Sequence, residues 1–409
     1  MNPEGQIDIR LTILPSGKKE VVILNNRPVH AAKLLIGKTI QDALKIIPLL
    51  YHVCGKAQGA AAIQALQAAR NVNSDKTTDL ARAMLCDVEL IREHLLRIYL
   101  DWPQILDGDE TASQLQSETS EFMGLLSQFE TALFGSNKPF SFETIASPEQ
   151  EQLTASIQKL EVILEKNVFG CCPDLWLKAK ARDVIFHWMR QDPCLSARCC
   201  DRILKKGWAQ EGQSTTPFLP DLSLTDYAAL LFPNNQRFDE EFIASPTWQG
   251  TPRETSSLSR CQKHPLINMI MAHCGSGLLT RYVSRLVEIA LVFARIKQAA
   301  LKLASQSHTQ IKTLSLQQQH TSSKTPSFGV GMVDAARGLL VHGVLLEGDE
   351  IRDYKILAPT EWNFHPEGVL SRALSQIQGQ NEAKVRDLAD LLIPAIDPCT
   401  KTSLEVIHA

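Results

Sequence analysis

Apolar and polar residues alternate near the start of the chain and again near its end. Residues 6–24 alternate around the turn Pro15-Ser16-Gly17, and residues 338–357 alternate around Glu347-Gly348-Asp349. Alternation with a period of two that is interrupted by turn residues is typical of antiparallel hairpins. The sequence therefore predicts a small antiparallel sheet near each terminus.

Between these hairpins, the apolar positions recur at helical spacing. We expect helices over 40–69, 76–100, 276–306 and about 381–393, and two more within 110–165. The first of these stretches contains many small residues, which would allow close contact with a neighbouring element. The chain shows no internal repeat. These elements together predict an α+β fold that is mostly α.

Two stretches interrupt the helical pattern. Residues 206–257 are rich in Gly, Pro, Ser and Thr, and residues 305–327 are polar with many Gln, Ser and Thr. Turn-forming and polar residues without apolar periodicity indicate loops or disorder. We expect 206–257 to run over the surface and 305–327 to be mobile.

Composition and charge narrow the classes of function. The 409 residues are 44% hydrophobic and 21% charged, with a formal net charge of -3. These values are ordinary for a soluble globular protein and argue against binding to nucleic acid or anionic membranes. The first residues show no basic segment followed by an apolar one, and no stretch has the roughly 18 uninterrupted apolar residues that a spanning helix needs. Ten cysteines in such a chain fit a reducing compartment. We expect a cytoplasmic protein without membrane insertion.

The first candidate for chemistry is Cys54, which lies in Tyr51-His52-Val53-Cys54-Gly55 at the expected start of a helix. Unpaired N–H groups at a helix N-terminus would lower the pKa of the thiol. Gly55 would let the backbone come close to whatever the sulfur binds. A second thiol three residues later, which a chelate would need, is replaced by Ala57. A buried structural cysteine is the alternative interpretation.

The second candidate is Cys399, which follows Asp397-Pro398 near the end of the chain. Pro398 fixes the backbone before the sulfur, and Asp397 could cap the following turn. Here too the position three residues later lacks a thiol, because Thr402 stands there. Two cysteine motifs at opposite ends of the chain therefore show the same departure from a chelating pair.

The order of the motifs resembles the large subunit of nickel–iron hydrogenases and, most closely, the HupK-type accessory proteins of hydrogenase maturation. The resemblance runs along nearly the whole chain. It rests on the two cysteine motifs, on the helical stretch 94–99, on Ala335-Ala336-Arg337-Gly338 before the late hairpin, and on Pro359-Thr360-Glu361-Trp362-Asn363. It implies one domain over residues 1–409, with a large-subunit-like helical core and small antiparallel sheets near both termini.

The departures from the hydrogenase pattern bear on activity. In the enzymes four cysteines hold nickel and iron, and the resemblance places Cys54 and Cys399 at the terminal positions, with Ala57 and Thr402 at the bridging ones. Because two thiolates cannot build a complete nickel–iron centre, the resemblance implies a non-catalytic relative. Only Ala409 follows His408, so the cleavable tail of hydrogenase precursors is missing, and we expect no nickel-triggered processing.

The resemblance also implies contacts around the metal. Arg337 and Thr360 match side chains that hydrogen-bond the cyanide ligands of iron in the enzymes. Without the resemblance, Arg337 would be interpreted as an ion pair at the base of the late hairpin. Glu4 matches a proton-relay carboxylate, for which a surface glutamate is the alternative. Trp362 and Asn363 are expected to support the fold.

These residues predict a carrier in hydrogenase maturation. Cys54 and Cys399 would transiently hold an iron–carbonyl–dicyanide fragment and pass it to the hydrogenase large-subunit precursor, with small maturation chaperones as partners. His52, Gly55, Asp397 and Pro398 would support the two thiols. Two alternatives stay open. One is a metal-free module that binds chaperones or protects the precursor from oxygen, and the other is a redox enzyme whose unusual metal centre is completed by His52 or His408.

A further group of cysteines lies in the stretch 171–200: Cys171, Cys172, Cys194, Cys199 and Cys200. No pair among them has the CxxC spacing of a zinc site, and adjacent cysteines make poor tetrahedral clamps. We expect half-buried helix cysteines there and no metal.

Overall fold

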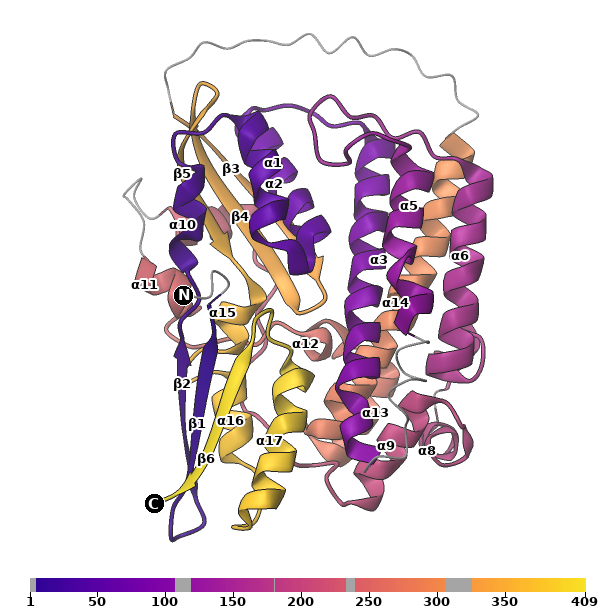
Figure 1. The fold of residues 1–409 in the computed structure, drawn as a ribbon, viewed down its shortest axis with the longest axis vertical. Coiled ribbons are helices and arrows are strands. Elements are labelled where there is room, and N and C mark those ends of the chain that lie inside the picture. The colour runs from indigo at the N-terminus through magenta and orange to yellow at the C-terminus, as the bar shows by residue number, and fades with distance from the viewer. Residues whose placement is uncertain (1–4, 107–118, 180, 233–239, 307–325) are drawn as a thin grey trace.

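The computed structural model describes residues 5–106, 119–179, 181–232, 240–306 and 326–409. Figure 1 shows a bundle of long helices on one side of the molecule and two small sheets on the other. None of the described helices is both long and apolar enough to cross a membrane.

The first sheet joins the two ends of the chain. The predicted N-terminal hairpin is confirmed as β1 (Ile7–Ile13) and β2 (Lys19–Asn25), and β6 (Thr402–His408) pairs with β1 in parallel, giving the order β2-β1-β6. Alternate residues of β1 are buried, as the period-two pattern requires. The hydrogen-bonded C-terminal strand was not predicted, and its addition makes this sheet mixed.

The second sheet contains β3 (Ser327–Ala335), β4 (Gly338–Glu347) and β5 (Glu350–Leu357) in sequential antiparallel order. The hairpin predicted for 338–357 is β4 and β5, whereas β3 was not predicted. Gly329 and Gly331 of β3 lie against the backbone of a helix, where a Cβ atom would collide with the carbonyl oxygens of Ala65 and Ala61. The small residues of that helix thus allow direct backbone contact with the sheet.

The helices predicted from periodicity are present, with one break inside the first stretch. Asp75 caps the N-terminus of the second predicted helix by accepting a hydrogen bond from the Thr78 amide. The bounds of the helices are η1 (Val29–Leu35), α1 (Ile40–Leu50), η2 (His52–Cys54), α2 (Gly55–Ala69), α3 (Lys76–Leu100), η3 (Trp102–Leu106), α5 (Leu125–Phe134), α6 (Gln150–Leu164), η4 (Glu165–Phe169), α7 (Pro173–Trp176), α8 (Arg182–Gln191), α9 (Leu195–Lys205), α10 (Leu224–Leu231), α11 (Glu240–Ala244), α12 (Ser257–Cys261), α13 (Pro265–Cys274), α14 (Leu278–Gln306), α15 (Pro359–Asn363), α16 (Val369–Ser375) and α17 (Glu382–Ile396).

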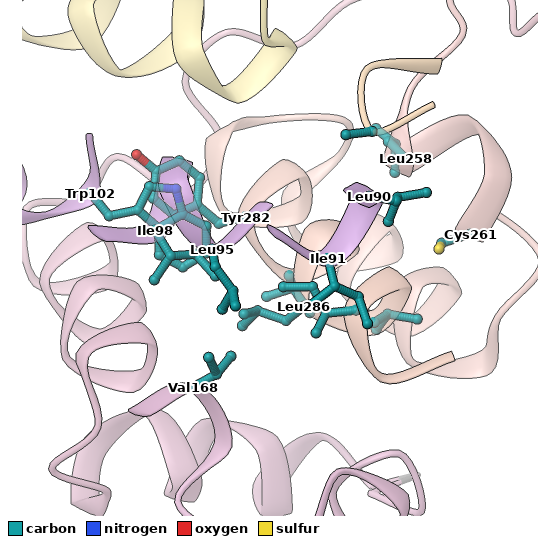
Figure 2. Packing of buried hydrophobic residues seen from close by; sticks show 14 of the residues in the cluster. Leu90, Ile91, Leu95, Ile98, Trp102, Val168, Leu258, Cys261, Tyr282 and Leu286 are labelled. Atoms are coloured by element: carbon teal, nitrogen blue, oxygen red, sulfur yellow. The ribbon is translucent and has the colours of Figure 1, made fainter. Parts of the chain in front are cut away.

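The main core lies where α3 packs along α14. Figure 2 shows Leu95 and Ile98 of α3 near Leu286 and Tyr282 of α14, and the ring of Trp102 stacks on Tyr282 with centroids 4.2 Å apart. Each fully buried side chain of this size contributes about 1.5–3 kcal/mol to folding. This core fixes α3, which carries several of the side chains described below.

The stretch 206–257 is less superficial than expected. It contains α10 and α11, and Tyr227, Leu231 and Glu254 are buried. The polar composition of this stretch suggested exposure, but polar groups can be buried when they are paired. The Glu254 carboxylate, for example, lies 2.7 Å from the guanidinium of Arg281 on α14. The expectation of a path over the surface is therefore wrong for these parts. Most of the second stretch, 305–327, lies outside the described residues.

Candidate metal centre

Cys54 and Cys399 line one cavity of about 280 Å³, together with Arg337 and Thr360. The four residues come from η2, from the segment between α17 and β6, from the turn between β3 and β4, and from α15. Both cysteines are half-buried and form no disulfide. The fold thus brings together side chains from both ends of the chain, as the motif order predicted, and among the described residues no other cysteine lines this cavity.

Thr360 holds Cys399 in place. Its Oγ1 donates to the Sγ of Cys399 at 3.1 Å and accepts from the Cys399 amide at 3.4 Å. Thr360 is completely buried in the first turn of α15, which begins at Pro359. The hydroxyl is therefore fixed beside the sulfur that would bind a metal.

Cys54 does not have the lowered pKa that its place at a helix start suggested. The amide groups of Lys56 and Ala57, which open α2, both donate to the carboxylate of Glu89 on α3 at 2.9 Å. Burial, with further contributions from the charges of Glu89 and Cys399, raises the pKa of Cys54 to about 12. The prediction was wrong mainly because the thiol is buried, and also because a carboxylate from another helix occupies the N–H groups that would have stabilised a thiolate.

Gly55 is not required for a close approach. Its backbone is in the ordinary right-handed helical region, and an added Cβ atom would meet the Pro48 carbonyl oxygen at 3.8 Å, a normal van der Waals distance. The predicted supporting role of Gly55 therefore has no steric basis here.

Arg337 is both an ion-pair partner and part of the cavity wall. Its Nη2 lies 3.1 Å from the Glu93 carboxylate, and its Nε lies 3.2 Å from Asp397 and donates to the Pro398 carbonyl at 3.2 Å. The ion-pair interpretation is confirmed, and the contact with cyanide ligands stays a prediction. These contacts also link the cavity wall to the Asp397-Pro398 segment that precedes Cys399.

Asp397 acts differently from the expected turn cap. It ends α17 in the left-handed region, with φ +68°, and its carboxylate lies among Arg337, Arg285 and Arg97 at 3.2, 3.4 and 3.8 Å. Burial opposes ionisation, but the three arginines outweigh it and lower the pKa of Asp397. The carboxylate therefore anchors the end of α17 next to Arg337 and gives no cap to the following turn.

Trp362 and Asn363 support the fold, as expected. Trp362 is buried, and the side-chain amide of Asn363 donates to the Arg337 carbonyl at 3.1 Å. The Oδ1 of Asn363 accepts from the Thr255 amide at 3.0 Å. Asn363 therefore ties the turn that carries Arg337 to the segment before α12.

Arg27 and Glu361 are cavity residues that sequence reasoning missed. Both line the cavity, and their side chains form a largely buried ion pair. Burial opposes the charge of Arg27, but Cys399, Glu361 and Cys54 outweigh it and raise the pKa of this guanidinium. Glu361 is visible in the motif Pro359–Asn363, whereas no local pattern marks Arg27, which follows β2.

The remaining predicted residues are not all part of the cavity. His408 lies on β6 with its Nε2 3.8 Å from Glu382, at the opposite end of α17 from Cys399, so a metal centre completed by His408 is contradicted. His52 lies in η2, but its side chain lies outside the part of the molecule that the structure describes, as does Glu4.

The two bridging positions carry no ligand for this cavity. Ala57 is buried in α2, and Thr402 lines a neighbouring cavity of about 610 Å³. Val53, Arg337 and Cys399 line both cavities, so the second, more polar space adjoins the first at the Cys399 side.

The cysteines of the stretch 171–200 are mostly core residues. Cys194, Cys199 and Cys200 are buried more deeply than predicted, and the Cys194 thiol donates to the Val168 carbonyl at 3.2 Å. The ligand atoms of Cys172, Glu161 and Glu165 lie within 4.8 Å of one another, but Lys297 already pairs with Glu161 at 3.5 Å.

Three kinds of similarity agree on the relationship. The family model for nickel-dependent hydrogenase matches residues 241–389. The chain is 27% identical to the hydrogenase expression/formation protein HoxV of Cupriavidus necator, over 94% of this chain and 92% of that one. It is 25% identical to the hydrogenase expression/formation protein HupV of Azotobacter chroococcum and 24% identical to HupK of Azotobacter vinelandii, covering 99% of each chain.

The fold matches solved hydrogenases. The Ni-Fe-Se hydrogenase of D. vulgaris Hildenborough superposes with a TM-score of 0.65 at 15% identity, over 93% of this chain and 92% of that chain. That of Desulfomicrobium baculatum gives 0.61 at 14% identity, over 94% of both. The matches extend over nearly the whole length of the chain in sequence and in fold, and the chain resembles the HupK-type relatives of the nickel–iron hydrogenase large subunit.

Proposed function

We propose that this protein acts in hydrogenase maturation as a non-catalytic carrier. Cys54 and Cys399 hold an iron–carbonyl–dicyanide fragment as cargo and pass it to the precursor of a hydrogenase large subunit, with small maturation chaperones as partners. The observation that carries the proposal is the shared cavity, in which two thiols from opposite ends of the chain lie beside Arg337 and Thr360. The names of the relatives, which are hydrogenase expression/formation proteins, support the maturation role.

The cavity fits such a fragment in size and chemistry. Its 280 Å³ corresponds to about nine water molecules of the liquid, which leaves room for an iron ion with three diatomic ligands. Thiolates suit iron, and guanidinium and hydroxyl groups donate hydrogen bonds to cyanide nitrogens. Arg337 has its Nη1 free of protein partners among the described residues, because Nε and Nη2 make its contacts. Arg27 adds a second guanidinium to the cavity wall.

Two thiolates without bridging cysteines favour a protein that holds and releases the iron fragment over one that catalyses the hydrogenase reaction. Ala57 and Thr402 supply no further sulfur, so nickel lacks the ligand set it has in the enzymes. A chelate of two sulfurs also releases its metal more readily than one of four. Release matters for a carrier because the cargo must move to another protein.

Infrared spectra test the proposal directly. Protein purified from a host that matures hydrogenase should contain iron and show carbonyl and cyanide stretches, and these bands should disappear in Cys54→Ser and in Cys399→Ser. Cys171→Ser is the matched control, since this half-buried thiol lies outside the cavity. Wild-type protein without the bands, or bands that persist in the double serine variant, would contradict the carrier.

A metal-free interaction module is the second candidate. One observation favours it: Leu49, on the cavity wall, is 79% exposed, as an apolar side chain at a binding surface would be. This module predicts that the double serine variant still co-purifies with maturation proteins in amounts equal to the wild type, whereas Leu49→Ser does not. The carrier predicts that both cysteines are needed for iron and for its delivery.

A further inference from the structure

A chain of buried polar groups leads from the second sheet to Cys54. The Tyr354 hydroxyl lies 2.8 Å from Nδ1 of His342, and Nε2 of His342 lies 2.8 Å from Oε1 of Gln58. The side-chain nitrogen of Gln58 in turn donates to the Sγ of Cys54 at 3.7 Å. These groups come from β5, β4, α2 and η2 in that order.

This series of hydrogen-bonded side chains lies in an otherwise apolar cluster. His342, Tyr354 and Gln58 are each at most 2% exposed, and around them pack the alanines of α2 and the aliphatic side chains of β4 and β5. Buried polar groups cost free energy unless every one is hydrogen-bonded, and an apolar set would pack there without that constraint. We therefore infer that these polar groups are needed where the hydrogen-bonded series ends, at Gln58 on the cavity wall.

The hydrogen bonds have only one consistent direction that places a donor on the sulfur. Burial lowers the pKa of His342 to about 3, so the imidazole is neutral and carries one N–H. If that hydrogen is on Nε2, it is donated to Oε1 of Gln58, and Nδ1 accepts from the Tyr354 hydroxyl. The amide nitrogen of Gln58 then must face Cys54. With the hydrogen on Nδ1, the amide would reverse and present its oxygen to the sulfur.

We propose that Gln58 is a positioning residue for the metal-binding thiolate of Cys54, oriented by the tautomer that Tyr354 and His342 impose. It presents an N–H donor to one sulfur of the pair, as the Thr360 hydroxyl does to the other. Hydrogen bonds to a ligand sulfur withdraw electron density from the metal–sulfur bond and so set how strongly the metal is held. The identity of the metal group rests on the proposed function, whereas the orientation of Gln58 does not.

Nitrogen NMR of the metal-free full-length protein, labelled with ¹⁵N-histidine, tests the orientation. The shifts of His342 should show the hydrogen on Nε2, and Tyr354→Phe should move the Nδ1 resonance and thereby assign it. A hydrogen on Nδ1 in the wild type would overturn the inference, because the Gln58 oxygen would then face the sulfur. This measurement requires no cargo, so it decides the orientation whether or not the protein carries iron.

Infrared spectra of the loaded protein test the effect on the metal. Gln58→Met keeps the length of the side chain but removes the donor, so the carbonyl stretch should shift to lower frequency as the iron becomes more electron-rich. Gln64→Met is the matched control on the same helix: its side chain is exposed and accepts from the Met332 amide. An unchanged band in Gln58→Met, or an equal shift in Gln64→Met, would contradict the positioning role. Wild-type protein without any carbonyl band would instead contradict the proposed function.

Discussion

Thr360 binds Cys399 with its hydroxyl as donor and as acceptor, so the side chain places the thiol and, under the proposed function, would also meet a ligand of the bound metal. The hydroxyl hydrogen points to the sulfur in this state. A cyanide ligand arriving in the cavity would compete for it, because a hydroxyl has a single hydrogen to donate. Variants of Thr360 can therefore separate its structural role, which is to hold Cys399, from its proposed role as a hydrogen-bond donor to a cyanide ligand.

Replacement of Thr360 by Val should remove the hydroxyl while keeping the shape of the side chain. We expect a loss of about 1–3 kcal/mol in the free energy of unfolding, the cost of leaving the buried partners of a hydrogen bond unsatisfied, measured by urea denaturation. The carbonyl and cyanide bands of loaded protein should shift without vanishing. Thr360→Ser retains the hydroxyl and should keep the bands of the wild type; equal spectra for Val and Ser would show that the hydroxyl has no role at the metal.

The buried cluster around Glu288 predicts a pH dependence of stability. Burial opposes ionisation of Glu288, but the ion pair with Arg260 and the hydrogen bond with His94 outweigh it and hold the pKa of Glu288 well below its usual 4.5. Burial is the main cause that lowers the pKa of His94 below 6.5. In both cases the unfolded chain binds a proton that the folded chain does not, so the stability contribution is lost as the pH falls.

The contribution of these two groups to the free energy of unfolding should therefore decrease as the pH falls below 6.5, and more steeply below 4.5, with a limit of about 1.4 kcal/mol per pH unit for each group. Burial raises the pKa of Glu89 to about 7, which acts in the opposite sense, so the contribution of Glu288 is the difference in slope between the wild type and Glu288→Gln. Urea denaturation between pH 7 and pH 4 measures this slope. In Glu288→Gln, the slope below pH 4.5 should be shallower, whereas the exposed Glu405→Gln should leave it unchanged. A slope in Glu288→Gln as steep as in the wild type would assign the acid sensitivity to other carboxylates.

At the scale of elements, the contact between α2 and β3 determines where Gln58 meets His342. Gly331→Ala would drive a Cβ atom into the backbone of α2 at Ala61, and neither backbone can move aside cheaply. We expect a loss of about 1–3 kcal/mol in the free energy of unfolding, from overpacking. Gly124→Ala, where a Cβ atom would meet only the end of Gln128 at 3.5 Å, is the control and should be nearly neutral.

The same variant links this contact to the cavity. If α2 is displaced from the sheet, the bond between Gln58 and His342 should lengthen, and the ¹⁵N resonances of His342 should shift in Gly331→Ala but not in Gly124→Ala. A destabilised Gly331→Ala with unchanged His342 resonances would show that the hydrogen bond between Gln58 and His342 tolerates movement of α2.

The sequence predicted the elements whose signal is local. α3 and α14 were expected within two residues of their bounds because their apolar periodicity is long, and β1, β2, β4 and β5 alternate around clear turns. β6 was missed because only Val406 of its seven residues is buried and its partner β1 lies at the other end of the chain. β3 was missed because its glycines lack side chains that could mark a face.

In the candidate site, too, residues in short local motifs could be predicted, whereas those placed by contacts between distant segments could not. Cys54, Cys399, Arg337 and Thr360 could be named because each stands in a short motif, and the shared cavity follows from the fold. Arg27 reaches the cavity only through tertiary packing, and no spacing in the sequence connects it to Cys54 or Cys399. Gln58 stands four residues after Cys54, a helical spacing that could have marked it, but its hydrogen bond with His342 of the second sheet depends on the fold. The pKa of Cys54 was predicted in the wrong direction for a similar reason, because both its burial and the approach of Glu89 from a helix that packs against α2 arise from tertiary packing.

At the scale of the whole molecule, β6 completes the sheet that holds both ends of the chain. A variant that ends at Lys401 should lose the ladder with β1 and the packing of Val406, which lowers the free energy of unfolding by about 3 kcal/mol or more. It should also expose the edge of β1 and associate with itself during size-exclusion chromatography. Ile407→Thr, on the exposed face, should change stability by no more than about 0.5 kcal/mol. A monomeric, equally stable truncated chain would show that β6 is dispensable.

The pairing of the first strand with the last has a consequence during synthesis. Cys54 and β1 are synthesised first, whereas Cys399 and β6 follow long after them in the chain. The cavity that both thiols line can therefore form only after Cys399 has left the ribosome. Under the proposed function, a product that stops between the two cysteines would be unable to hold the fragment.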